Sequence, residues 1–241
     1  VVSHLQAIFL THLHGDHTFG LIGMLSTFGL LGRIQDLHIY GPQDLQRIFQ
    51  PQIDYFCADS PFKIILHEID TKKPQVLYED RSVIISTLPL SHRVPCCGYL
   101  FQEKPTLRHI RRDMIDFYHI PISQINNIKA GMDWTTEDGT LIPNERLTTP
   151  SDPVRSYAYC TDTTYRPQLA ELLKGVTCLY HEATFAEEHA QLAKSTFHST
   201  ASQAAQIAKD TQAGQLILGH FSSRYKSEEV LLQEAQQIFP N

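Results

Sequence analysis

Residues 11–17 read THLHGDH, and this stretch indicates the fold of the chain. Four side chains that commonly bind metal ions fall within six positions of it: His12, His14, Asp16 and His17. The apolar run QAIFL comes directly before the stretch and has the composition of a buried strand. A single histidine at a strand end is more often structural, but four such side chains on one loop predict a metal site.

Four later strand-like runs also end on residues that can bind a metal ion or transfer a proton. They read LPLSH, YAYCTD, CLYHE and LILGH, and they end at His92, Asp162, His181 with Glu182, and His220. In α/β proteins, sites form at strand ends because loops converge there while the sheet holds them in place. We therefore expect these residues to meet the histidine loop of residues 12–17.

The expected ligands are imidazoles and carboxylates, without clustered thiolates, and this donor set suits zinc or a related transition metal. The seven candidates are His12, His14, Asp16, His17, His92, Asp162 and His220. Seven ligands are too many for one tetrahedral ion and fit two ions that each keep an open position. Two metal ions about 3.5–4 Å apart can activate water and stabilise a displacement at phosphorus.

Strand and helix signals alternate along the 241 residues, which predicts one α/β domain spanning 1–241. We expect a buried apolar helix over 18–31, and Thr200 with Gln203 matches a capping box that begins another helix. Residues 104–150 differ from the rest, because their first part, 104–121, is amphipathic and basic and their last part is rich in turn residues. The Asp-Gly pair at 138–139 predicts a hairpin turn.

Composition narrows the class of protein. The net charge of -6 argues against a generally basic nucleic-acid binder but leaves room for a local basic patch. The five cysteines are odd in number and form no CxxC pair, which predicts reduced thiols and a cytoplasmic location. No apolar run approaches 18 residues, so we expect no membrane association. The chain opens on VVSHLQAIFLTH, without Met or a turn, and we expect that an N-terminal segment is missing from it.

The motifs resemble those of a known family. THLHGDH resembles the HxHxDH signature of the metallo-β-lactamase superfamily. LSHRVPCCGYLF, CTDTTY, HEATF, FHSTASQAA and LGHFSSRY together resemble ribonuclease Z, the tRNA 3′-processing endonuclease family, and the likeness runs from about residue 3 to residue 226. The resemblance implies a four-layer αβ/βα sandwich whose first strands are absent from this chain.

The resemblance also implies two Zn²⁺ ions per subunit and a role for each candidate residue. One zinc would be held by His12, His14 and His92, and the other by Asp16, His17 and His220, with Asp162 bridging them. Asp16 would accept a proton from the attacking water, and His198 would protonate the leaving 3′-oxygen. Glu182 would hydrogen-bond His198 and orient it.

The activity implied by the resemblance is zinc-dependent removal of the 3′ trailer from precursor tRNA, leaving a 3′-hydroxyl on the tRNA and a 5′-phosphate on the trailer. The resemblance also implies a homodimer and an inserted, flexible arm at about 104–131 that grips the tRNA, although the family's usual Gly-Pro pair is not clear there. One alternative is a hydrolase of the same fold that acts on small phosphodiesters or sulfate esters. Another is a non-catalytic RNA-binding or scaffold homologue, which the intact ligand set argues against.

Overall fold

The computed structural model describes residues 4–240, which form two compact units. Unit 1 comprises the chain up to residue 78, residues 85–101 and the chain from residue 156 onward. Unit 2 comprises residues 79–84 and 102–155. Every candidate catalytic and metal-binding residue belongs to unit 1. Within the described residues, no helix is both long enough and apolar enough to span a membrane.

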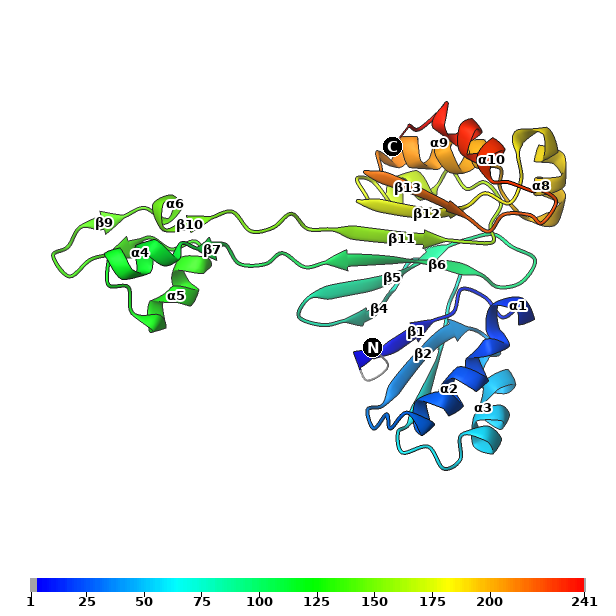
Figure 1. Cartoon of the computed structure of the whole chain (residues 1–241), viewed down its shortest axis with the longest axis horizontal. Coiled ribbons are helices and arrows are strands. Elements are labelled where there is room, and N and C mark those ends of the chain that lie inside the picture. The colour runs from blue at the N-terminus through cyan, green and yellow to red at the C-terminus, as the bar shows by residue number, and fades with distance from the viewer. Residues whose placement is uncertain (1–3, 241) are drawn as a thin grey trace. The chain divides into compact units, whose positions relative to one another are not determined.

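A three-stranded parallel sheet forms one half of unit 1. It contains β1 (Ala7–Phe9), β2 (Leu37–Pro42) and β3 (Ile64–Ile69) in that order. Parallel neighbours need a long crossover, and α2 (Gly20–Leu30) and α3 (Leu45–Phe56) supply these connections on one side of the sheet (Figure 1). Leu25, Leu37 and Leu45 are fully buried between the sheet and its helices.

A six-stranded sheet forms the other half, in the order β13-β12-β11-β6-β5-β4. Its strands are β4 (Val76–Glu79), β5 (Val83–Pro89), β6 (Cys97–Glu103), β11 (Ser156–Cys160), β12 (Cys178–Glu182) and β13 (Gln215–Gly219). Its helical elements are α7 (Leu169–Leu172), η2 (Glu187–His189), α8 (Ala190–Thr196), α9 (Ala201–Thr211) and α10 (Glu229–Gln236). Leu179, Ile207 and Leu231 are fully buried where α9 and α10 pack with this sheet.

An aromatic cluster joins the two sheets. Phe9 stacks on Tyr40 at 4.9 Å between ring centroids and also contacts Tyr99 and Phe101 of β6. The Tyr99 hydroxyl donates to the Leu10 carbonyl at 2.6 Å, and the Cys97 amide donates to the Thr11 carbonyl at 3.0 Å. Unit 1 is therefore layered as helix, sheet, sheet and helix, which is the predicted αβ/βα sandwich (Figure 1).

Of two predictions about single helices, the one for the start of α9 is confirmed and the one for residues 18–31 is partly wrong. The capping box is confirmed, because the Gln203 amide donates to Thr200 Oγ1 and the Thr200 amide donates to Gln203 Oε1. The prediction of one buried helix over 18–31 is wrong in its bounds and in its burial. Short α1 (Gly15–Thr18) precedes α2, and Phe19 and Leu30 are 85% and 86% exposed. An outer-layer helix has the sheet on one side only, so only one face is buried.

Unit 2 has a small core of its own. Its elements are β7 (His109–Ile110), α4 (Arg112–Phe117), α5 (Ile122–Lys129), β8 (Trp134–Thr135), β9 (Leu141–Ile142), α6 (Asn144–Leu147) and β10 (Thr148–Thr149). Ile120, Ile128 and Leu147 are buried together, and β8 pairs with β9 across the predicted hairpin turn. The segment 104–131 lies within this larger unit, and its role as an arm stays a prediction.

Candidate functional site

The histidine loop leaves the carboxyl end of β1. His12 is fully buried, and its Nδ1 lies 3.1 Å from Thr11 Oγ1. His14 stands at the N-cap of α1, whose single turn carries Asp16 and His17. The Thr18 hydroxyl donates to the His14 carbonyl at 2.9 Å and closes this turn. The loop thus presents several imidazoles within a few residues while Thr11 and Thr18 fix its backbone and its first ring.

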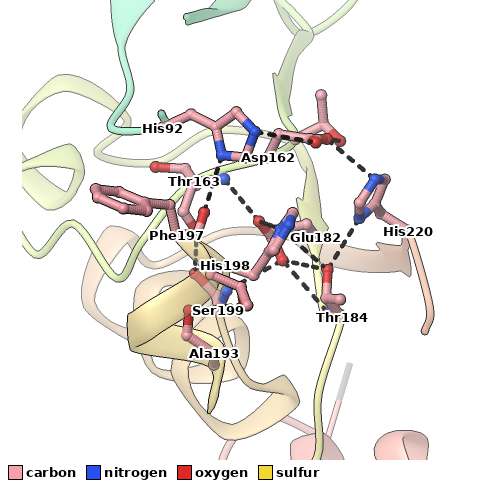
Figure 2. Close-up of polar contacts among 12 residues, drawn as sticks. His92, Asp162, Thr163, Glu182, Thr184, Ala193, Phe197, His198, Ser199 and His220 are labelled. Atoms are coloured by element: carbon pink, nitrogen blue, oxygen red, sulfur yellow. Dashed lines mark hydrogen bonds and ion pairs between the residues drawn. The ribbon is translucent and has the colours of Figure 1, made fainter. Parts of the chain in front are cut away.

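Three parallel strands bring the later residues to the same edge. Cys160 of β11 is level with His181 of β12, and Glu182 is level with Gly219 of β13. Asp162 and His220 follow these strands directly, so they must lie beside Glu182 (Figure 2). Both adopt left-handed backbone conformations, with φ of 50° and 58°. Such conformations are uncommon outside glycine and cluster at functional sites.

Asp162 is the centre of the constellation. Its Oδ2 lies 3.7 Å from His12 Nε2, 3.6 Å from His17 Nε2 and 3.8 Å from His92 Nε2. Its Oδ1 lies 3.2 Å from His220 Nε2 and accepts a hydrogen bond from Thr161 Oγ1 at 2.7 Å. Three imidazoles therefore face one carboxylate oxygen and a fourth faces the other, so Asp162 lies within reach of ligands from both predicted sets.

The donor atoms fit metal binding. Two of the groups that converge within 4.8 Å are His12, His14, His92 and Asp162, and His17, Asp162 and His220. Ligand atoms about 3.4 Å apart form the edge of a tetrahedron whose metal–nitrogen distance is about 2.1 Å, and the separations around Asp162 lie near that value. His12 Nε2 is buried and has no hydrogen-bond partner among the described residues, so this nitrogen has no evident role without an ion.

Asp16 is the predicted ligand that does not join these groups in the described residues. Its side chain is 79% exposed, and its Oδ2 lies 3.5 Å from His17 Nε2. It stands next to the second group, and its roles as ligand and proton acceptor stay predictions.

Burial favours the neutral form of two of the imidazoles, those of His12 and His92. Burial lowers the pKa of His12 to about 4, against the opposing charge of Asp162. Burial also lowers the pKa of His92, against its hydrogen bond to a backbone carbonyl and the charge of Asp162. For Asp162, burial favours the neutral acid, but the neighbouring histidines and Thr161 together hold its pKa below the usual range. Neutral imidazoles beside an ionised carboxylate are the protonation states that metal binding needs.

Glu182 and His198 form a second element of the site. Glu182 is fully buried, and its Oε1 lies 2.9 Å from His198 Nδ1 (Figure 2). The same carboxylate accepts backbone N–H bonds from Thr163 at 2.6 Å and Ser199 at 3.0 Å, so it is held rigidly. Burial alone would lower the pKa of His198, but the Glu182 hydrogen bond and charge outweigh burial and raise it.

Thr184 connects this pair to the metal-binding residues. Its hydroxyl lies 2.5 Å from Glu182 Oε2 and 2.9 Å from His220 Nδ1 (Figure 2). An ionised carboxylate only accepts, so the Thr184 proton goes to Glu182 and the hydroxyl oxygen accepts from His220 Nδ1–H. His220 Nε2 then carries the lone pair that faces Asp162. A hydrogen bond at the far ring nitrogen is the usual way in which proteins orient a metal-binding histidine.

The loop before α9 does the same for His92. His92 Nδ1 lies 3.1 Å from the carbonyl of Phe197, which adopts a left-handed φ of 63°. Sequence reasoning missed both Thr184 and Phe197. Thr184 could have been found from the sequence, because it lies two residues after Glu182 in the motif HEATF. A backbone carbonyl has no sequence signal, because any residue supplies it.

His181 and Arg224 lie at the border of the site. His181 is fully buried, and its Nδ1 lies 2.8 Å from the Glu182 carbonyl. It is outside the groups of converging donors in the described residues. Arg224 stacks over Phe185 at 5.4 Å and donates to Ser222, so local packing accounts for this pair.

The chain is similar in sequence and in fold to proteins of the β-lactamase superfamily. The family model described as "Beta-lactamase superfamily domain" matches residues 1–138 and 146–221. The crystal structure of human tRNase Z, short form, superposes with a TM-score of 0.65 at 23% identity, over 94% of this chain and 76% of that chain. The metallo-β-lactamase fold protein YhfI of Bacillus subtilis gives 0.62 at 22% identity, over 100% of this chain and 74% of that chain. The fold is that of the metallo-β-lactamases.

Closer relatives narrow the class to one family. Ribonuclease Z of Bacteroides thetaiotaomicron is 55% identical over 238 residues, which cover 99% of this chain and 75% of the relative. Ribonuclease Z of Porphyromonas gingivalis W83 is 49% identical over 232 residues, 96% of this chain and 76% of the relative. The chain belongs to the ribonuclease Z family of the β-lactamase superfamily. It is an endoribonuclease, a hydrolase of phosphodiester bonds.

Proposed function

We propose that the chain is a zinc-dependent endoribonuclease that removes the 3′ trailer from precursor tRNA. Cleavage leaves a 3′-hydroxyl on the tRNA and a 5′-phosphate on the trailer. The observation that carries the proposal is the convergence of the imidazoles on both oxygens of Asp162, beside a separate His198–Glu182 pair. The names of the relatives, Ribonuclease Z and tRNase Z, support tRNA as the substrate.

We assign the ligands as two sets that share Asp162. His12, His14 and His92 would hold one zinc ion, and Asp16, His17 and His220 the other. When bound, such a pair supplies an activated water and positive charge beside the phosphoryl oxygens. The chain's own contribution is to fix the imidazole orientations through Thr11, Thr184 and Phe197.

The proton transfers are assigned to Asp16, which is also one of the proposed ligands, and to His198. Asp16 would accept the proton of the attacking water, and its exposed position leaves it free to reach solvent. His198 would donate a proton to the leaving 3′-oxygen, and its raised pKa keeps it protonated closer to neutrality. Glu182 would act as a positioning residue, because it touches His198 and backbone amides.

The test is cleavage of precursor tRNA by His198→Ala, with metal content measured on the same samples. Positioned general acids contribute typically 10²–10⁴-fold, so we expect a loss of that order in turnover with about two metal ions retained. His4→Ala, at an exposed position, serves as the matched control. Loss of metal from His198→Ala would instead make His198 structural and contradict its role as the acid.

Location and assembly belong to the same proposal. We expect a cytoplasmic enzyme, since the cysteines are free thiols and four of the five are buried. We also expect a homodimer, as the family resemblance implies, and sedimentation equilibrium measures this directly. Hydrolysis of small phosphodiesters or sulfate esters alone is the alternative, and turnover of a chromogenic diester without any cleavage of precursor tRNA would favour it.

A further inference from the structure

A cavity of about 430 Å³ lies beside His198 in unit 1. Its wall includes Tyr165 from the loop after β11, Gln191 and Lys194 from α8, and Gln203 from the first turn of α9. The cavity therefore shares one residue, His198, with the site described above. Its volume falls within the range of about 300–1,000 Å³ that is typical of small-ligand pockets.

Two backbone features fix the cavity relative to the catalytic imidazole. The His198 amide donates to the Ala193 carbonyl at 2.8 Å, so the end of α8 positions His198. The capping box holds Gln203 at the start of α9. The helix α8, which carries Lys194, ends just before His198, and α9, which carries Gln203, begins just after it. Lys194 and Gln203 therefore lie on either side of His198 along the chain.

The lining has the chemistry of an anion site. Lys194 supplies a positive charge, and no carboxylate is among the described residues that line the cavity. Gln203 uses its side-chain oxygen to accept from the Thr200 amide, which leaves its N–H groups as donors. Tyr165 adds an aromatic ring. A cation, amide donors and an aromatic ring together suit a nucleotide, whose phosphate, sugar and base need these three kinds of contact.

We propose that this cavity binds the nucleotide whose 3′-oxygen receives the proton of His198, with Lys194 contacting the phosphate on its 5′ side. The inference rests on the proposed function, because that function makes His198 the donor to a 3′-oxygen. The group that His198 protonates must lie within hydrogen-bond reach of its ring. His198 is the residue that the cavity shares with the proposed metal site, so a nucleotide held in this cavity would present its 3′-oxygen to His198.

A simpler account of Lys194 exists and makes a different prediction. Lysine in the last turn of a helix interacts favourably with the helix dipole and can remain solvated. In that case its removal changes stability slightly and leaves RNA binding unchanged.

The experiment measures precursor-tRNA cleavage by Lys194→Gln over a range of salt concentrations. Removing one lysine–phosphate contact lowers the salt slope of log kcat/KM by about 1. We expect KM to rise about five- to tenfold, with a smaller change in kcat and unchanged metal content. Lys209→Gln, in the last turn of α9 and outside the cavity lining, is the control and should retain wild-type kinetics.

A second variant, Gln203→Glu, is expected to keep the fold while it makes the cavity less favourable for an anion. Glutamate serves a capping box as well as glutamine does, so Gln203→Glu keeps the helix start while adding a negative charge to the cavity. We expect a larger rise in KM than for Lys194→Gln, with an unchanged thermal midpoint. Wild-type KM and salt slope in both variants would overturn the proposal.

A small diester, bis(p-nitrophenyl) phosphate, separates the possible failures. It has no neighbouring nucleotide, so the loss on RNA in Lys194→Gln should exceed the loss on the diester at least fivefold. Equal losses on both substrates would place Lys194 in the catalytic centre and contradict the subsite. A wild-type enzyme that hydrolyses the diester and leaves precursor tRNA intact would overturn the proposed function itself.

Discussion

Thr184 joins the two halves of the site through a single hydroxyl. It donates to Glu182, which holds His198, and it accepts from His220, which faces Asp162. The Phe197 carbonyl makes the corresponding link between His92 and the residue before His198. The groups that would transfer protons and the groups that would hold metal ions therefore share their supporting hydrogen bonds.

Thr184→Val tests this link because valine keeps the shape and removes the hydroxyl. His220 then loses the acceptor that fixes its tautomer, and we expect metal affinity to fall about 10–100-fold. Thr184→Ser keeps the hydroxyl and should retain affinity near the wild-type value. Competition with a chromophoric chelator measures the affinity, and circular dichroism checks the fold. Equal affinity in the Val and Ser variants would show that the hydroxyl does not orient His220.

At the level of elements, the site depends on how closely β6 and β11 approach. Gly98 of β6 lies against β11, and a Cβ added there would stand 2.5 Å from the Tyr159 carbonyl oxygen. These strands lead from the His92 loop and into Asp162, so their spacing sets the geometry of the ligands. Backbone cannot move away as a flexible side chain can, and the sheet must separate to admit a methyl group.

Gly98→Ala should lower the free energy of unfolding by about 1–3 kcal/mol, the usual cost of overpacking. We also expect weaker metal binding, because β6 and β11 flank the ligand loops. Urea denaturation and metal analysis measure the two effects. Retention of both stability and metal would contradict the close approach of the strands.

Gly23→Ala is the matched control for this substitution. Gly23 lies inside α2, and a Cβ added there meets no atom within 4 Å. Alanine in a helix interior is favoured over glycine by about 0.5–1 kcal/mol, so this variant should be more stable than the wild type. A lower free energy of unfolding in Gly98→Ala together with a higher one in Gly23→Ala would show that the loss comes from the contact at Gly98. An added methyl group in general would not produce opposite changes.

The elements also show what the sequence can predict. The strand ends could be predicted because buried apolar runs stop at polar residues, which are His12, His92, Asp162 and His220. These residues meet because the strands end near the same edge of the sheets. The capping box at Thr200 was identified because its chemistry is local. The exposed face of α2 was not predicted, because the burial of a helix depends on the layer that it occupies. The left-handed backbone at Asp162 and His220 was also missed, because composition does not encode it.

For the whole molecule, charge limits what unit 2 can do. It carries ten Asp and Glu residues and eight Lys and Arg residues, so it is not basic as a whole. Arg108 donates to Thr148, and Arg111 pairs with Asp113, so two of the arginines in the segment 104–131 have protein partners. Any grip on tRNA by this unit must therefore come from specific contacts more than from general attraction.

Replacing residues 106–153 with a short Gly-Ser linker tests that grip. The ends are close, because the Glu103 amide donates to the Arg155 carbonyl at 2.9 Å, so a short linker spans them. If unit 2 grips tRNA, kcat/KM for precursor tRNA should fall at least about 100-fold, which corresponds to about 2.7 kcal/mol of lost binding. Turnover of the small diester and the metal content should stay near wild-type values, because all proposed ligands lie in unit 1. Equal losses on both substrates would mean that unit 2 supports the fold of the site and does not bind tRNA.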